Sequence, residues 1–497
     1  MRARREALVA IGVEAGAAEP LHRQVYGELR GAILGGRLKP GARLPSSRAL
    51  ADELGVSRNT VLSAFEQLAG EGYIETRRGS GSYVPSVLPE ELLSFRGGVL
   101  RPKAKTPKPV SSKRGLALAE SAYVRDLGPG GAFSVGLPDC REFPFALWAR
   151  ILGKGWRHPS PALFSGSEPG GHMPLRAAIA DYVRGVRGMR LLAEQVIVVA
   201  GIRPAVELAA RVLLDPGDGA WVEEPGFPGI RAALIAADVV PLSVPVDAEG
   251  IAIPGPAATP AGRPVRLACV TPSHQYPLGA VMSLARRLDL LAWAAAAGAW
   301  IIEDDYDSEF RYAGRPLAAL QSLDEQGRVI YAGNFSKVMF QSLRLGYLVV
   351  PEHLVETFVK VRGGIEDLPS SVVQPAVAEF IASGHFAAHI RRMRKRYAAR
   401  QAMLLAAAER YLGGLLELAP DPTGLHLVAY LTPELARRMS DLTAVERARA
   451  ANVRALPLSR YYAGPKRRQG LLLGYAAAAD SEVRPAVQRL AAALRAE

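Results

Sequence analysis

A lysine and an arginine that lie just after or within apolar runs are the residues of this chain best suited to chemistry. Lys337 follows residues 329–332 (VIYA), which read as a buried strand ending in a Gly-Asn turn, and Arg344 lies within Leu-Arg-Leu-Gly. A buried ammonium is costly unless the amine is neutral and bonded to a carbonyl carbon as an imine. A guanidinium in such a setting needs a forked partner, a phosphate or a carboxylate. Taken alone, the pair also fits a surface lysine and one half of an ion pair.

A cluster of acids decides between these interpretations. Residues 300–303 (WIIE) read as a strand, and residues 304–307 (DDYD) follow at its C-terminal end. Clustered carboxylates are costly unless a cation lies beside them, and ligands bind at the carboxyl edge of open α/β sheets. A lysine for an imine, an arginine for a phosphate and an acid for a ring nitrogen together fit pyridoxal phosphate, whose protonated ring acts as an electron sink.

Alternating elements from residue 126 onward are expected to position these side chains. Apolar runs there alternate with helical stretches, which predicts a mostly parallel sheet covered on both faces. The predicted strands are residues 196–199, 220–222, 267–270, 300–302, 329–331 and 346–350.

The first 85 residues predict a DNA-reading unit. Apolar residues recur at helical spacing over residues 21–33, a second helix begins near Ser46 or Ser47 and ends at Gly55, and a third follows Ser57. Two short strands around a basic glycine loop then form a wing. A helix-turn-helix of this kind inserts its second helix in the major groove, although a helical docking module with a charged face is the alternative. The residues expected to contact DNA are Arg48, Ser57, Arg58, Asn59, Thr60, Arg77, Arg78 and Gly79.

Length and charge agree with a multidomain protein that has an anionic partner. The chain has 497 residues, and its 61 Lys and Arg against 48 acids give a net charge of +13. The two cysteines, Cys140 and Cys269, are expected to be buried thiols in a reducing cytosol, and no Cys/His cluster has zinc-ligand spacing. The N-terminus lacks the apolar core of a signal peptide, and no run is long enough to span a bilayer. A cytoplasmic protein without metal is expected.

Several sequence blocks resemble the MocR-type regulators, which are GntR-family bacterial transcription factors with an aminotransferase-like module. The blocks are LPSSRALADELGVSRNTV (44–61), TPSHQYPLG (271–279), IIEDDYDSEFRY (301–312), YAGNFSK (331–337) and SLRLGY (342–347). The resemblance implies a GntR-type winged helix-turn-helix (α+β) over residues 1–85 and an α/β domain of type I aminotransferase fold over residues 126–497, with a smaller C-terminal subdomain. Residues 86–125, rich in proline and basic residues, read as a linker. A head-to-tail homodimer is implied as well.

The resemblance also assigns roles to single residues. Arg460 matches the arginine that binds the carboxylate of an amino-acid ligand, with a surface arginine as the alternative. Phe227 matches the aromatic residue on the cofactor ring, with a core phenylalanine as the alternative. The remaining matches are Asp304 to the pyridine nitrogen, Tyr306 to the ring hydroxyl, Lys337 to the internal aldimine and the local base, and Arg344 to the phosphate.

Residues near the expected phosphate site depart from the family pattern. Ile202 offers no side-chain donor at the start of a predicted helix, and Pro204 lacks an N–H there. Arg203 is expected to compensate with its charge. Asn334 replaces the usual Ser or Thr, and Tyr276 stands where many aminotransferases have asparagine beside the ring hydroxyl. We therefore expect cofactor to bind more loosely than in metabolic aminotransferases.

These features favour a pyridoxal-phosphate-dependent transcriptional regulator. It would bind operator DNA and sense an amino compound or a B6 vitamer through the internal aldimine on Lys337. The first alternative is an active aminotransferase that carries a DNA-binding module. The second is a cofactor-free DNA binder in which the large module only dimerises.

Overall fold

The computed structural model of the chain contains two compact units, Met1–Val110 and Ser111–Glu497. Each unit has its own hydrophobic core. The structure describes residues 11–14, 16–77, 80–88, 111–121, 131–157, 161, 168–255, 264–314, 317–365, 369–465 and 468–496.

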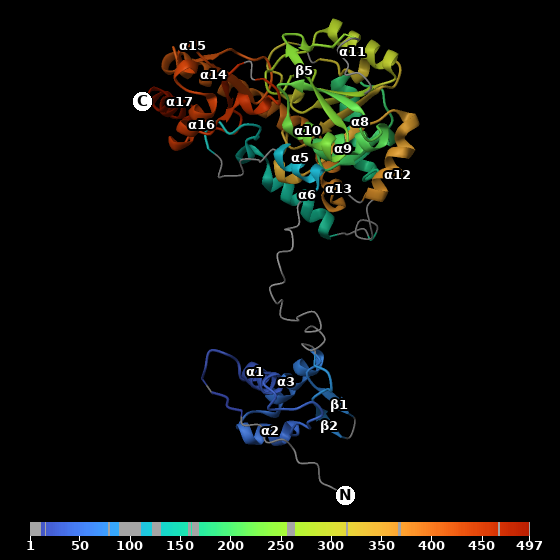
Figure 1. Cartoon of the computed structure of the whole chain (residues 1–497), viewed down its shortest axis with the longest axis vertical. Helices are drawn as coiled ribbons and strands as arrows, with labels where there is room; N and C mark the ends of the chain where they lie inside the picture. The colour runs from blue at the N-terminus through green and yellow to red at the C-terminus, as the bar shows by residue number, and fades with distance from the viewer. Residues whose placement is uncertain are drawn as a thin grey trace, which may run out of the picture. The chain divides into compact units, whose positions relative to one another are not determined.

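The N-terminal unit is a winged helix-turn-helix, as predicted, with three helices among its described residues. Ser46 begins α2 by accepting a hydrogen bond from the Ala49 amide (3.2 Å), and Gly55 ends it in the left-handed conformation with φ 66°. Strands β1 and β2 pair antiparallel with Glu75 opposite Tyr83, which forms the wing. Arg78 and Gly79 lie outside the described residues. The elements are α1 (Leu21–Leu34), α2 (Ser47–Leu54), α3 (Arg58–Gly70), β1 (Glu75–Arg77) and β2 (Gly81–Tyr83) (Figure 1).

Part of the range predicted as a linker is helical. Helix α5 (Lys113–Ser121) begins where the Ser112 hydroxyl accepts a hydrogen bond from the Gly115 amide (3.0 Å), and it contacts α10 of the large unit. Prolines and charges dominate residues 86–125 and predict a tether, but the Leu-Ala-Leu-Ala run within them favours helix.

The large unit is built on an eight-stranded sheet that is mostly parallel, as predicted. Strands β4, β5, β7, β8 and β9 run parallel to their neighbours in that group, and β10 runs antiparallel to both β3 and β9. In sheet order the strands are β3 (Val196–Val199), β10 (Gly346–Val349), β9 (Val329–Asn334), β8 (Trp300–Asp305), β7 (Val265–Val270), β4 (Gly219–Glu224), β5 (Val240–Asp247) and β6 (Gly250–Ile251).

Both faces of this sheet are covered by helices. Along β3, Ile197 and Val199 pack in one core cluster with α9 and α10, whereas Val196 and Val198 pack in another with α8. Continuous apolar strands therefore have a partner on each side. The helices are α6 (Phe145–Arg157), α8 (Met173–Arg187), α9 (Ile202–Leu213), α10 (Pro228–Ala236), α11 (Leu284–Ala297), α12 (Val355–Ile365) and α13 (Gln374–Ala382).

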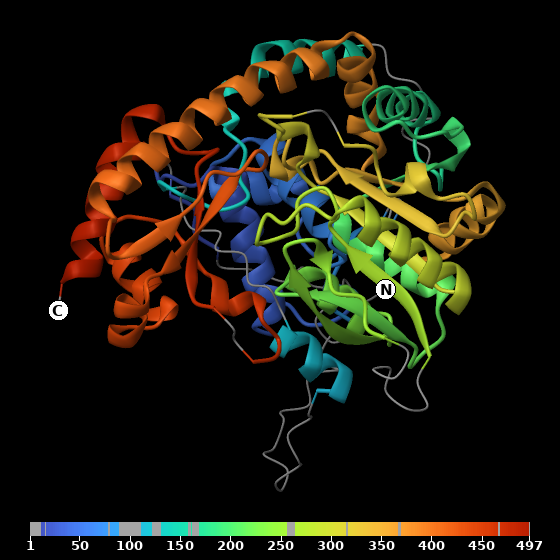
Figure 2. The ribbon, with the colours of Figure 1, turned by 90° about the horizontal axis from the view of Figure 1, so that it is seen from above.

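A C-terminal subdomain with its own four-stranded sheet completes the large unit. The long helix α14 (His385–Tyr411), orange in Figure 2, runs alongside this subdomain and contacts α17 and β11. The other elements are β11 (Leu416–Leu418), β12 (His426–Leu431), α15 (Pro433–Arg438), α16 (Asp441–Ala450), β13 (Leu456–Pro457), β14 (Gly470–Gly474) and α17 (Asp480–Arg495).

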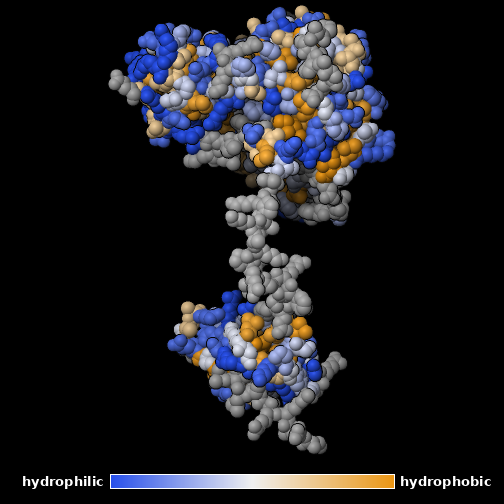
Figure 3. All heavy atoms as spheres, in the orientation of Figure 1, coloured by the Kyte–Doolittle hydropathy of each residue, from blue (hydrophilic) through white to orange (hydrophobic). Residues whose placement is uncertain are grey.

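Hydrophilic side chains predominate on the visible surface of each unit, with smaller hydrophobic patches between them (Figure 3). Among the described residues, no helix has the length and apolar character needed to cross a membrane. Cys269 is buried, but Cys140 is exposed because it begins a short surface turn, so the expectation that both thiols are buried was wrong for Cys140.

Candidate functional site

Lys337 lies just beyond the end of β9, with its amine directed at the backbone of a distant segment. Its Nζ donates a hydrogen bond to the Gly136 carbonyl oxygen at 2.7 Å. A Cβ atom on Gly136 would lie 2.6 Å from that Nζ, and Gly136 has φ 72°. Only glycine combines this backbone conformation with the necessary space. Gly136 could not be predicted from the sequence, since a single loop glycine 201 positions away has no distinguishing pattern.

Asp304, near the carboxyl end of β8, is a buried acid with an unsatisfied oxygen. Its Oδ1 has no hydrogen-bond partner among the described residues, and the residue is 5% exposed. Burial, followed by repulsion from Asp305 and Glu223, raises the pKa of Asp304 well above its usual value, while Lys337 lowers it. A buried acceptor without a donor is costly. A ligand that brings a ring N–H to this oxygen would remove that cost, so the site fits a protonated pyridine.

The other acids at this edge already have partners. Asp305 lies 2.8 Å from the buried guanidinium of Arg187 and accepts a hydrogen bond from the Tyr331 hydroxyl at 2.5 Å. Asp307 pairs with His274 at 2.9 Å. Asp305 Oδ1 also has no hydrogen-bond partner among the described residues, but Arg187 balances the charge of that carboxylate. Asp304 has an orphaned oxygen as well, and Lys337 lowers its pKa.

Tyr276 brings three aromatic residues of the site together. Its ring makes edge contacts with Phe227 (5.9 Å between centroids) and Tyr306 (5.6 Å), and its hydroxyl lies 3.0 Å from that of Tyr461. The predicted ring-contacting residues Phe227, Tyr306 and Tyr276 thus form one cluster. Tyr461, which the sequence analysis passed over, connects this cluster to its neighbour Arg460.

The segment that carries Arg460 is fixed against the end of β4. Glu224 Oε1 accepts hydrogen bonds from the amides of Ala463 (2.7 Å) and Gly464 (2.8 Å), and the Gly226 amide donates to the Tyr461 carbonyl at 3.1 Å. Arg460 itself is exposed. The arginine expected to bind a carboxylate therefore lies on a segment that is hydrogen-bonded to Gly226, the residue before Phe227.

Three chain segments converge where the phosphate was expected. A Cβ on Gly346, at the start of β10, would lie 3.3 Å from both Asn334 Cβ and Gly201 Cα. Gly201 precedes α9 with φ 125°, and Asn334 ends β9 and accepts a hydrogen bond from the Ser336 amide at 3.1 Å. Arg344 is exposed and lines a hollow of about 340 Å³ together with Ala200. Ala200, two residues before α9, therefore lines the same hollow as Arg344.

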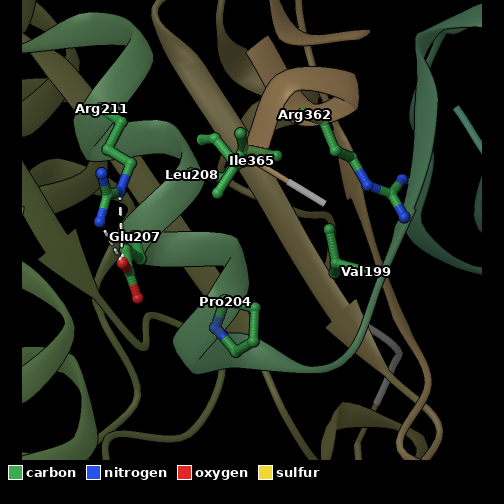
Figure 4. A pocket seen from close by; sticks show the side chains of 7 residues that line it. All are labelled: Val199, Pro204, Glu207, Leu208, Arg211, Arg362 and Ile365. Carbon is green, nitrogen blue, oxygen red and sulfur yellow. Dashed lines mark hydrogen bonds and ion pairs between the residues drawn. The ribbon is translucent and has the colours of Figure 1, made fainter. Parts of the chain in front are cut away.

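Arg203 and Pro204 point to different sides of α9. A Cβ on Gly229 would lie 3.2 Å from Arg203 Cδ and 2.4 Å from Phe227 Cε1, so Arg203 and Phe227 flank the same glycine. Pro204 instead lines a small hollow of about 40 Å³ with the Glu207–Arg211 ion pair (Figure 4). That volume holds a few water molecules at most and is too small for a cofactor.

The first turn of α3 presents two exposed polar side chains. Arg58 and Asn59 are exposed, whereas the Ser57 hydroxyl accepts the Thr60 amide hydrogen (3.1 Å) and lies 2.8 Å from the Thr60 hydroxyl. Ser57 caps the helix, whereas Arg58 and Asn59 are the exposed side chains of this turn, and Arg58 Nε donates a hydrogen bond to the Ser47 hydroxyl at 3.4 Å. Arg48 is exposed on α2. In the wing, the Arg77 guanidinium lies over the Tyr83 ring at 4.9 Å.

Comparison with known proteins assigns a family to each unit. The family model for bacterial regulatory proteins of the gntR family matches residues 21–84, and that for aminotransferase class I and II matches residues 157–490. A crystal structure of Pyrococcus horikoshii kynurenine aminotransferase superposes with a TM-score of 0.67 at 23% identity, covering 81% of this chain and 99% of that chain. The aminotransferase class I and II family implies dependence on pyridoxal phosphate in general, and the gntR-family domain implies DNA binding.

Two curated relatives share both units. The probable rhizopine catabolism regulatory protein MocR of Rhizobium meliloti is 41% identical over 479 residues, which cover 95% of this chain and 94% of that protein. The pyridoxine biosynthesis transcriptional regulator PdxR of Corynebacterium glutamicum is 34% identical and covers 91% of each chain. The chain belongs to the MocR-type transcriptional regulators, in which a gntR-family winged helix is fused to an aminotransferase-like domain.

Proposed function

We propose that this regulator holds pyridoxal phosphate at the carboxyl edge of its large sheet and uses it to sense an amino compound or a B6 vitamer. When bound, the cofactor supplies an aldehyde that reacts with amines and a ring that withdraws electrons. The observation that carries the proposal is Asp304, a buried carboxyl group with an orphaned oxygen, electrostatically coupled to Lys337.

Each end of the cofactor has a candidate partner in the chain. Asp304 would accept the ring N–H, Tyr306 would hydrogen-bond to the ring hydroxyl, and Phe227 would pack against the ring. Lys337 would supply the amine that attaches the cofactor and, once released, hold or transfer a proton. Gly136 supports this role because its carbonyl oxygen already orients that amine.

The phosphate end lacks one backbone donor, because Pro204 lies in the first turn of α9. The backbone N–H groups of Ile202 and Arg203 lie in the first turn of α9, where an anion is favoured, but Pro204 contributes none. The side chains that remain are Arg203, Asn334 and Arg344. A site with charge but few short-range donors should release the cofactor more readily than a full phosphate cup, which suits a sensor of vitamer supply.

Arg460 would bind the carboxylate of an amino-acid effector, because it is exposed on a segment fixed beside Phe227. An effector would act through its different affinities for two states of the protein. A head-to-tail homodimer would present two winged helices to a repeated or inverted operator.

Titration of pyridoxal phosphate into the cofactor-free protein tests the cofactor site. Wild type should gain a visible absorption band, and borohydride reduction should add the cofactor mass to the peptide that contains Lys337. Lys337→Ala should abolish both signals, whereas Lys360→Ala, a lysine paired with Glu356 on the surface of α12, should retain them. A band that persists in Lys337→Ala would refute the attachment, and tight, slowly exchanging binding by wild type would refute the weakened phosphate site.

Binding to the DNA upstream of its own gene tests the winged helix. Arg58→Ala should weaken binding by a factor equivalent to about 1–3 kcal/mol if Arg58 contacts a base, and it should relax the sequence preference. Arg23→Ala removes the same charge from an exposed position on α1 and serves as the control. Equal losses in the two variants would show that Arg58 contributes only general electrostatic attraction.

The ring-contacting cluster also leaves room for a second function, an active aminotransferase. Phe227, Tyr306, Asp304 and Lys337 are the residues that such an enzyme would need around its cofactor ring. Steady keto-acid-dependent turnover on the order of 1 per second or faster would support the enzyme. A single half-reaction without cycling would support the sensor.

A further inference from the structure

His274 is a buried histidine in contact with two carboxylates. It follows β7 in the loop after Val270, and its side chain is 1% exposed. Its Nδ1 lies 2.9 Å from Asp307 Oδ2 and its Nε2 lies 3.0 Å from Asp421 Oδ2. A neutral imidazole has one N–H, but two carboxylates each need a donor. The doubly protonated cation satisfies both, and although burial opposes the charge, Asp307 and Asp421 raise the pKa of His274 to about 10.

The two carboxylates come from different parts of the large unit. Asp307 follows β8 at the edge of the large sheet, whereas Asp421 lies in the loop between β11 and β12 of the C-terminal subdomain. The imidazole is closely surrounded. A Cβ on Gly424 would lie 2.3 Å from His274 Cε1, and a Cβ on Gly279 would lie 2.3 Å from Asp421 Oδ2. His274 therefore connects the large sheet to the C-terminal subdomain through tightly packed contacts.

Tyr306 is the third partner of the same imidazole. Its hydroxyl oxygen lies 2.9 Å from His274 Nδ1, and the two rings stack at 5.9 Å with an interplanar angle of 26°. In the cation, Nδ1–H is a donor, and it is shared between Asp307 and the Tyr306 hydroxyl oxygen. Because that oxygen acts as an acceptor, the phenolic hydrogen of Tyr306 remains free to donate to another group. Tyr306 is also fixed at its ring edge by Tyr276 at 5.6 Å.

We propose that His274 is a positioning residue that directs the Tyr306 hydroxyl hydrogen at the ring oxygen of the cofactor. Asp421, in the C-terminal subdomain, fixes the orientation of His274 and so contributes to this positioning. The proposal rests on the proposed binding of pyridoxal phosphate. Any shift of the loop that carries Asp421 alters the support of Tyr306, and a change at the cofactor ring is felt in that loop. Tyr306, His274 and Asp421 thus connect the contact with the cofactor ring to the C-terminal subdomain.

A double-mutant cycle in the full-length chain tests the proposal, with pyridoxal phosphate affinity read from visible absorption. Tyr306→Phe should weaken binding about fivefold, the loss of roughly one hydrogen bond. Asp421→Asn should weaken binding about threefold in the wild-type background and have no further effect in Tyr306→Phe. Asp480→Asn, which removes the carboxylate that pairs with Arg400 in the same subdomain, should leave the affinity unchanged. An equal effect of Asp421→Asn in both backgrounds would show a merely structural role and overturn the proposal.

A second measurement needs no cofactor. Nitrogen NMR of the imidazoles in the cofactor-free protein should show both nitrogens of His274 protonated, with the signal assigned by its loss in His274→Gln. Tyr306→Phe should shift the Nδ1–H signal. An unchanged signal would overturn the hold on Tyr306. Failure of wild type to bind pyridoxal phosphate would instead refute the proposed function, and the NMR result would still decide whether His274 holds Tyr306.

Discussion

Replacing Glu223 by glutamine should favour the folded protein more at alkaline pH than at acidic pH. Glu223 lies near the end of β4, is 7% exposed, and accepts hydrogen bonds from the Thr271 amide (3.0 Å), the Thr271 hydroxyl (2.5 Å) and the Gln275 side chain (3.2 Å). Burial raises the pKa of Glu223 from 4.5 to about 7, and these hydrogen bonds offset only part of the rise. Near neutral pH the folded protein must therefore accommodate a buried charge.

The sign and size of the effect follow from proton linkage. The unfolded chain loses the Glu223 proton near pH 4.5 and the folded chain near pH 7, so folding is favoured below this window and the contribution is lost as the pH rises through it. At about 1.4 kcal/mol per pKa unit, the loss amounts to about 3 kcal/mol at most. Beyond the folded pKa, both states are ionised and the contribution stays constant.

Thermal unfolding of the cofactor-free protein across the pH range provides the assay. Glu223→Gln keeps the size of the side chain and stays neutral, although its NH2 group must face at least one of the Thr271 and Gln275 donors at every pH. Its Tm relative to that of wild type should therefore rise by several degrees between about pH 5 and about pH 8. Glu434→Gln makes the same chemical change at an exposed position on α15 and should show no such trend. A difference in Tm between Glu223→Gln and wild type that stays constant over this range would refute the reasoning.

Three further substitutions test other parts of the molecule. Arg187→Met leaves the buried carboxylate of Asp305 unpaired and should lower the free energy of unfolding by about 3–5 kcal/mol; a loss under half of that in urea unfolding would contradict the pairing. Ser57→Ala removes the cap of α3 and should cost about 1 kcal/mol, seen as faster amide hydrogen exchange in that helix but not in the large unit. Gly136→Ala introduces a Cβ into a left-handed backbone position at a cost of about 1–2 kcal/mol and should slow pyridoxal phosphate capture by displacing the Lys337 amine. Unchanged capture kinetics in stopped-flow absorption would show that the Gly136 contact is incidental.

Local signals in the sequence were sufficient for the elements and for one edge of the site. Ser46 and Ser57 are strong N-cap signals and Gly55 is a strong helix-termination signal. The helix-turn-helix was therefore predicted together with its caps. Apolar strands followed by polar residues located the carboxyl edge of the sheet, because in a parallel sheet those ends meet. The sequence alone therefore predicts that Asp304 and Lys337 lie near each other.

Contacts between distant loops were beyond such reasoning. Gly136 and Asp421 are single residues in irregular segments, and only tertiary packing brings them to Lys337 and His274. His274 itself was within reach, since it lies in the loop after a predicted strand at the ligand-binding edge. The helix α5 was missed because proline and charge dominate the composition of its neighbourhood.

The orphaned oxygen of Asp304 has a consequence for the protein in the cell. A cofactor that bound at this carboxyl group, and only in the folded state, would stabilise the chain by an amount that grows with cofactor concentration. Less stable chains are removed faster by proteases. The steady-state amount of this regulator would then rise and fall with vitamin B6 supply. Its concentration would respond to the vitamin through protein degradation alone, without any change in the transcription of its own gene.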